Sequence, residues 1–157
     1  MKKYIFYDSD TSGNTDYDIK GECYQKLINL CASHCPYFTL TKVSDYSPIF
    51  EELEAYRIER PTVCPISKSQ YTISGFKSYN LYYCVCMESI SVLLRIGSIF
   101  SYLWHNISVN QPEDLTFYRP DGRVFFSSVT HEGECMLYLE DNEETDIVLN
   151  KHWQQII

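Results

Sequence analysis

The sequence lacks the patterns that mark nucleotide-binding, membrane-spanning and secreted proteins. Six glycines occur in 157 residues and never gather into a glycine-rich loop, so the motifs that cradle phosphates or dinucleotides are absent. The longest apolar stretch, residues 90–107, contains Arg95 and His105, so we interpret it as a buried helix and not as a membrane span. The apolar run from Tyr4 to Tyr7 is too short for a secretory signal peptide. We therefore expect a cytoplasmic protein that does not bind nucleotides through these motifs.

Basic residues are also scarce. Lys and Arg together number 13 against 21 Asp and Glu, which gives a formal net charge of −8. A negative field repels the phosphate backbone of nucleic acids and the surface of anionic membranes. We expect neither nucleic acid nor membrane as a partner, and a basic protein is the best electrostatic match.

Cysteine is plentiful, but the seven cysteines form no recognisable disulfide or metal pattern. Their odd number, without a signal peptide, indicates reduced thiols in a reducing compartment. Cys31 and Cys35 flank His34 at a spacing that suits zinc, but both fall on an apolar helical stripe, where free cysteine is commonly buried. Cys84 and Cys86 would share one face of a strand. We therefore expect no metal and no cofactor.

Nucleophilic catalysis by a Cys–His pair is a further alternative. Nothing in the sequence places a thiol at a helix N-terminus or beside a cation, the settings that activate cysteine. We therefore expect no catalytic residue of this kind. The residues that such a pair would have to use are Cys64, Cys135, His105 and His131.

The hydrophobic pattern predicts one α+β domain over residues 1–157, built on a largely antiparallel sheet. Apolar residues recur at helical spacing before Pro36 and predict an N-terminal helix at about 22–35. A longer helix is predicted at about 88–106. Apolar residues cover most of its circumference, so we expect it to be buried against the sheet.

Turn residues predict a β-meander near the C-terminus. Pro120-Asp121-Gly122 separates its first two strands, and Gly133 separates the second from the third. The three strands are expected at 115–119, 123–129 and 134–139. The remaining expected elements are strands at 3–7, 37–43, 70–73 and 78–86, a short helix at 49–56, and a helix or strand within 147–157.

The stretch from Pro112 to Leu139 resembles a group of short bacterial proteins. These proteins share a late pattern of Pro-Glu-Asp, Phe-Tyr, Asp-Gly, Ser and His-Glu, which this chain carries from Pro112 to Glu132. The helix and strand order upstream is loosely similar. The group has no established activity, so the resemblance carries no catalytic or cofactor-binding residue with it.

The most site-like cluster is His131-Glu132-Gly133-Glu134-Cys135. A His beside carboxylates and a thiol could serve as an acid–base pair or a metal ligand, but the second His of the zinc helix motif is missing. One interpretation is a functional turn at His131 and Glu132; the other is a solvated turn in which Cys135 packs into the core. A shared site with Arg119 and Asp121 is disfavoured, because the second meander strand separates the two pairs by about 20 Å.

An acidic run lies after the meander, and it is either a solvated loop or a docking face for a basic partner. The docking interpretation predicts a non-enzymatic protein that binds another protein. The best match is an immunity protein that neutralises a basic bacterial toxin domain, by analogy with small acidic inhibitors rich in Tyr. The alternatives are a small enzyme or ligand-binding domain using the His131 region, and a structural protein. The partner-binding residues expected are Glu140, Asp141, Glu143, Glu144 and Asp146.

Overall fold

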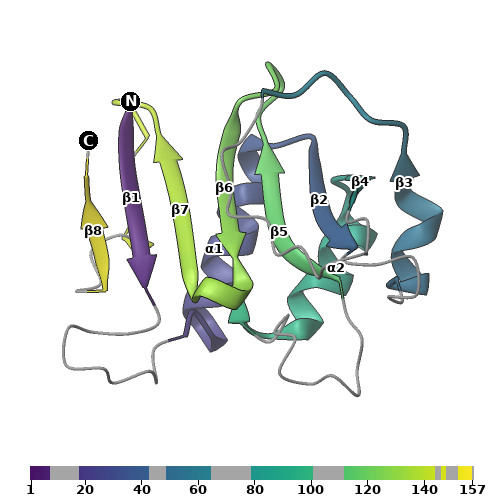
Figure 1. The fold of residues 1–157 in the computed structure, drawn as a ribbon, viewed down its shortest axis with the longest axis horizontal. Coiled ribbons are helices and arrows are strands. Elements are labelled where there is room, and N and C mark those ends of the chain that lie inside the picture. Colours follow the sequence, from purple (N-terminus) through teal and green to yellow (C-terminus); the bar gives the residue numbers. More distant parts are fainter. Residues whose placement is uncertain are drawn as a thin grey trace, which may run out of the picture.

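The protein is an α+β domain with one antiparallel sheet, as the sequence predicted. The computed structural model describes residues 1–7, 18–42, 49–64, 79–100, 112–143, 146–147 and 152–156, without the side chain of His131. Within these ranges eight strands form the sheet in the order β3-β4-β2-β5-β6-β7-β1-β8 (Figure 1). The strands are β1 (Lys2–Tyr7), β2 (Tyr37–Lys42), β3 (Arg57–Ile58), β4 (Tyr79–Cys84), β5 (Glu113–Tyr118), β6 (Val124–Val129), β7 (Glu134–Leu139) and β8 (Trp153–Gln155).

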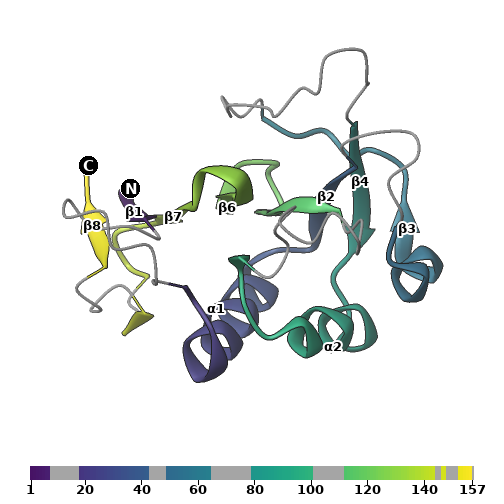
Figure 2. The same ribbon diagram turned by 60° about the horizontal axis from the view of Figure 1, so that its bottom comes forward.

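Two helices, α1 (Gly21–His34) and α2 (Met87–Ile96), lie side by side on one face of the sheet (Figure 2). The hydroxyl of Tyr24 on α1 donates a buried hydrogen bond of 2.5 Å to the carbonyl of Leu93 on α2. The backbone N–H of Gly21 donates to the carbonyl of Gly97, so the start of α1 is also tied to the end of α2. The helices therefore form one layer.

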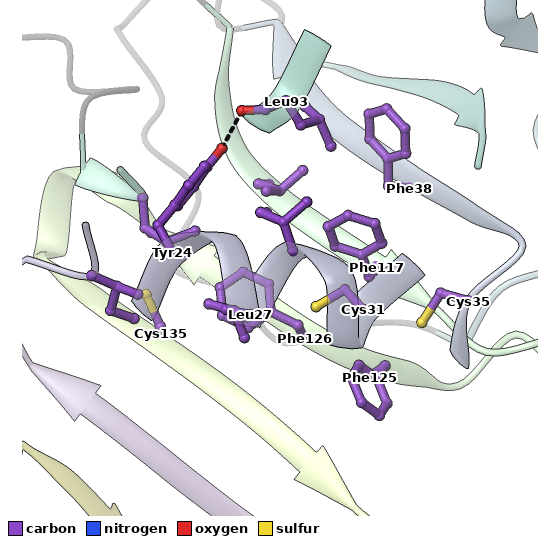
Figure 3. Packing of buried hydrophobic residues seen from close by; sticks show 14 of the residues in the cluster. Tyr24, Leu27, Cys31, Cys35, Phe38, Leu93, Phe117, Phe125, Phe126 and Cys135 are labelled. Carbon is purple, nitrogen blue, oxygen red and sulfur yellow. Dashed lines mark hydrogen bonds between the residues drawn. The ribbon is translucent and has the colours of Figure 1, made fainter. Parts of the chain in front are cut away.

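The core lies between this helical layer and the sheet (Figure 3). Phe38, Phe117 and Phe126 pair in register across β2, β5 and β6 and present one apolar face. The rings of Phe38 and Phe117 lie 5.4 Å apart. Leu27 from α1 and Leu93 from α2 are fully buried against this surface. The helical spacing that predicted α1 is confirmed, because the residues on that stripe are the ones that α1 buries.

The second helix is shorter than the sequence predicted. It ends at Ile96, where Gly97 takes a left-handed φ of 84° and stops the helix, instead of continuing to residue 106. Residues 101–111 lie outside the described part of the chain. Met87, Ser91 and Arg95 are exposed, so α2 has a solvent side and is not apolar all round.

Some of the predicted strands are confirmed and others differ in the structure. All three meander strands are confirmed as β5, β6 and β7, and the predicted short helix is a 3-10 helix, η1 (Glu51–Tyr56). The strand predicted at 78–86 ends at Cys84, and Cys86 instead caps the N-terminus of α2. The C-terminal segment contains a strand, β8, which pairs with β1. The strand predicted at 70–73 lies outside the described residues.

The turn between β5 and β6 packs against the segment after β3. Gly122 has a φ of 82°, and a Cβ at this position would lie 2.5 Å from the carbonyl oxygen of Thr62. The backbone N–H of Cys64 donates to the carbonyl of Gly122 at 2.9 Å. This close backbone approach requires a residue without a side chain.

Gly122→Ala should therefore lower the free energy of unfolding by about 2 kcal/mol, from left-handed strain and from the clash together. Gly97→Ala is the matched control, because Gly97 also has a positive φ but has open space around its Cα. The control should cost only about 1 kcal/mol. Urea denaturation of both variants measures the difference, and equal losses would mean that Thr62 gives way to the added methyl group.

Candidate functional sites

A buried ion pair anchors the acidic run, residues 140–146, which we call the acidic loop. Arg119 lies just after β5 and donates two hydrogen bonds to the Glu143 carboxylate, from Nη1 to Oε1 at 2.8 Å and from Nη2 to Oε2 at 2.5 Å. Nη2 also donates to the carbonyl of Tyr138 at 3.0 Å. The backbone N–H of Glu140 donates to Oε2 of Glu143 at 2.7 Å, which closes the loop on itself. Glu143 is thus a structural anchor.

The surroundings of this pair are largely excluded from water. The side chains of Arg119 and Glu143 are 10% and 14% exposed. The Arg119 guanidinium lies 4.7 Å from the ring of Phe125, and the ring of His34 stacks on Phe125 at 5.0 Å. His34 Nδ1 lies 3.3 Å from Oε1 of Glu143. The hydrogen bonds from Arg119 lower the pKa of Glu143, which therefore stays ionised.

The other acids of the loop have weaker and more exposed partners. Glu140 accepts from Arg123 at 2.6 Å, and Arg123 also bonds Asp121. Asp146 accepts from Lys26 of α1, and Asp141 pairs with the N-terminal amine of Met1. The side chains of Asp141 and Asp146 are 81% and 65% exposed, and exposed pairs of this kind contribute at most about 1 kcal/mol. Glu144 lies outside the described residues.

The His131 region is a tight turn. Residues 130–132 form a 3-10 turn, η3 (Thr130–Glu132), and Gly133 follows it with a φ of 64°. Glu132 is exposed, whereas Cys135 is fully buried on the core face of β7. Burial, and then the charge of Glu132, raises the pKa of Glu134. The structure places this turn and the Arg119–Asp121 segment at opposite ends of β6, so it does not bring them together.

The Cys31, His34 and Cys35 group does not converge on a point where a metal could sit. Cys31 and Cys35 are buried, and burial is the main cause that raises the pKa of both thiols. The His34 ring lies instead against Phe125 and Glu143. Across the described ranges, no cluster of three or more His, Cys, Asp or Glu could hold a metal ion. Nor does any helix in those ranges have the length and apolarity needed to cross a bilayer.

Sequence reasoning missed Glu113, which begins β5 two residues before the strand predicted at 115–119. It is 2% exposed, and its Oε2 has no hydrogen-bond partner among the described residues. Burial, and then the charge of Asp114, raises the pKa of Glu113 to about 7. Asp114 has a φ of 54° and exchanges hydrogen bonds with Thr130, so the strand kinks here. A Pro-Glu-Asp sequence before an alternating strand gives no sign of such burial.

The sheet face around Glu113 is polar as well as buried. Thr39, Thr116 and Ser127 pair across β2, β5 and β6 on the face opposite the core phenylalanines, and each is about 1% exposed. The Ser127 hydroxyl has no hydrogen-bond partner in the described structure. Burying a hydroxyl without a partner costs free energy, so Ser127 is a local source of instability that the apolar core must offset.

The titratable and nucleophilic side chains that the structure describes are thus spread over the molecule and form no common site. The group most accessible to a partner is the exposed acids of the acidic loop. Glu143 is mostly buried, whereas Asp141 and Asp146 face solvent. No family model, no curated protein and no solved structure matches the sequence.

Proposed function

We propose that the chain is a non-enzymatic protein-binding protein, and specifically a cytoplasmic immunity protein that neutralises a basic bacterial toxin domain. The observation that carries the proposal is the acidic loop, in which the buried Arg119–Glu143 pair holds the turn at residues 140–143 and Asp141 and Asp146 are exposed to solvent. The net charge of −8 adds a long-range attraction for a basic partner.

The geometry suits recognition by charge in two ways. A loop that is already anchored loses less conformational entropy when it binds, so more of the interaction energy appears as affinity. The pairs of Asp141 with the N-terminal amine and of Asp146 with Lys26 are weak and exposed, so arginine or lysine of a partner can replace them at little cost. Steering by such charges raises the association rate more than it slows dissociation.

The proposal predicts a specific effect of charge reversal. The double variant Asp141→Lys/Asp146→Lys should associate with the basic toxin domain about tenfold more slowly at low salt, and its unfolding free energy should change by less than about 1 kcal/mol. Stopped-flow association and urea denaturation measure the two quantities. Added salt should slow the wild-type protein in the same way.

A matched control separates the loop from net charge alone. Glu59→Lys/Glu88→Lys makes the same change in total charge at exposed positions beside β3 and at the start of α2. Strand β3 lies at the sheet edge, with four strands between it and β7, from which the loop continues. The control should slow association clearly less. If the two double variants slowed association equally, or if the association rate of the wild-type protein did not depend on salt concentration, the docking role of the loop would be refuted.

A further inference from the structure

Two cysteines, Cys84 and Cys86, lie at the junction between β4 and α2. Cys84 is the last residue of β4 and Cys86 is the N-cap of α2, with Val85 between them. Both thiols are free and partly exposed. Burial, and then the neighbouring Cys86 thiol, raises the pKa of Cys84. Because the two residues are separated by one residue and Cys86 is in extended backbone, their side chains lie on the same side of the chain.

The side chain of Ser89 holds this pair in place. The Ser89 N–H donates to Sγ of Cys86 at 3.5 Å, and the Cys86 N–H donates to Oγ of Ser89 at 3.0 Å, which forms a capping box. The Ser89 hydroxyl also donates to the carbonyl of Cys84 at 2.8 Å. Cys86 thus caps the N-terminus of a ten-residue helix, and its sulfur is held by the first turn of that helix.

We propose that Cys84 and Cys86 form a thiol–disulfide exchange site that takes a small disulfide such as oxidised glutathione. The thiolate of Cys86 attacks one sulfur of glutathione disulfide, which forms a mixed disulfide and releases one glutathione thiolate. The thiolate of Cys84 then attacks Sγ of Cys86 and releases the second glutathione thiolate. Two protein thiols are oxidised to one disulfide, and the two glutathione thiolates take up the two protons that the protein loses, so one glutathione disulfide is reduced to two thiols.

The product disulfide would be strained and readily reduced. Two residues apart in extended chain, the Cα atoms of Cys84 and Cys86 are separated by about 7 Å, at the upper limit for a disulfide. Strained disulfides are more oxidising than structural ones, so the site returns to the dithiol in a reducing compartment. The link also draws Sγ of Cys86 away from the Ser89 N–H and weakens the cap of α2.

The other cysteines provide internal comparisons. Cys31, Cys35 and Cys135 are buried in the core, whereas Cys23 on α1 and Cys64 after β3 are exposed. Exposed single thiols should acquire glutathione and stop there. The buried thiols should react only when the protein unfolds.

The test treats the native full-length chain with oxidised glutathione, alkylates the remaining thiols and maps the peptides by mass spectrometry. We expect a Cys84–Cys86 disulfide, seen as the loss of two hydrogens, with glutathione attached to Cys23 and Cys64. Cys84→Ser should stop at glutathione on Cys86, and Cys86→Ser should abolish the intramolecular bond. The proposal is overturned if Cys84 and Cys86 remain alkylatable while Cys23 and Cys64 react. It is equally overturned if each carries glutathione separately in the wild-type protein.

Discussion

Glu143→Gln should lower the free energy of unfolding by about 3 kcal/mol, because it leaves the guanidinium of Arg119 buried without an opposite charge. Arg119 is 10% exposed, and its Nε already lacks a hydrogen-bond partner within the described structure, so the loss of Glu143 cannot be made up by solvent. Urea denaturation at neutral pH measures the effect. The same change should loosen the turn at residues 140–143, since Glu143 also accepts the N–H of Glu140.

Two further variants distinguish the buried pair from surface charge. Glu140→Gln removes a carboxylate whose partner, Arg123, is 46% exposed, so it should cost less than about 1 kcal/mol. Adding Arg119→Met to Glu143→Gln should recover part of the lost stability, because the unpaired buried charge is removed. Similar losses for Glu143→Gln and Glu140→Gln would show that the pair at Arg119 is no stronger than a surface contact.

Glu113→Gln should change the pH dependence of stability in the opposite sense to most carboxylate substitutions. The pKa of Glu113 is raised from 4.5 to about 7 in the folded protein, so folding binds its proton. That stabilisation is complete below the unfolded pKa and is lost as the pH rises through about 7. The wild-type protein therefore loses about 3 kcal/mol relative to the variant between about pH 5 and about pH 9.

The measurement is the difference in unfolding free energy between Glu113→Gln and wild type across that pH range. The two proteins should be nearly equal at about pH 5, where Gln imitates a protonated carboxyl group, and the variant should be more stable at about pH 9. Glu132→Gln, an exposed neighbour at the same end of β6, should track the wild type. A difference for Glu113→Gln that does not depend on pH would mean that its carboxyl group keeps an ordinary pKa.

The sequence predicted elements wherever a local rule decides them. The stripe from Tyr24 to Cys31 placed α1, and Gly122 and Gly133 placed the turns of the meander, because helical spacing and positive φ are properties of a few adjacent residues. The second helix was extended too far because its apolar pattern continues past Gly97. There a single left-handed residue outweighs the periodicity.

The candidate sites depended on long-range contacts that no local pattern reveals. Arg119 and Glu143 are 24 residues apart and meet only because β6 and β7 bring the acidic loop back beside the end of β5. Sequence reasoning therefore assigned the same docking role to all five acids of the loop, although one of them, Glu143, is a structural anchor. Glu113 was missed for the same reason, since its burial depends on how the sheet is covered and not on its neighbours in the chain.

The most direct test of the proposed function is a titration of a purified basic toxin domain with the native protein. An immunity protein acts by stoichiometric binding, so toxin activity should fall linearly and reach zero at one chain per toxin domain. The mixture should then elute as a single complex that high salt weakens. Full activity at a molar excess of the chain would contradict the account. Loss of activity at far less than one chain per toxin would contradict it too, because that result requires catalysis.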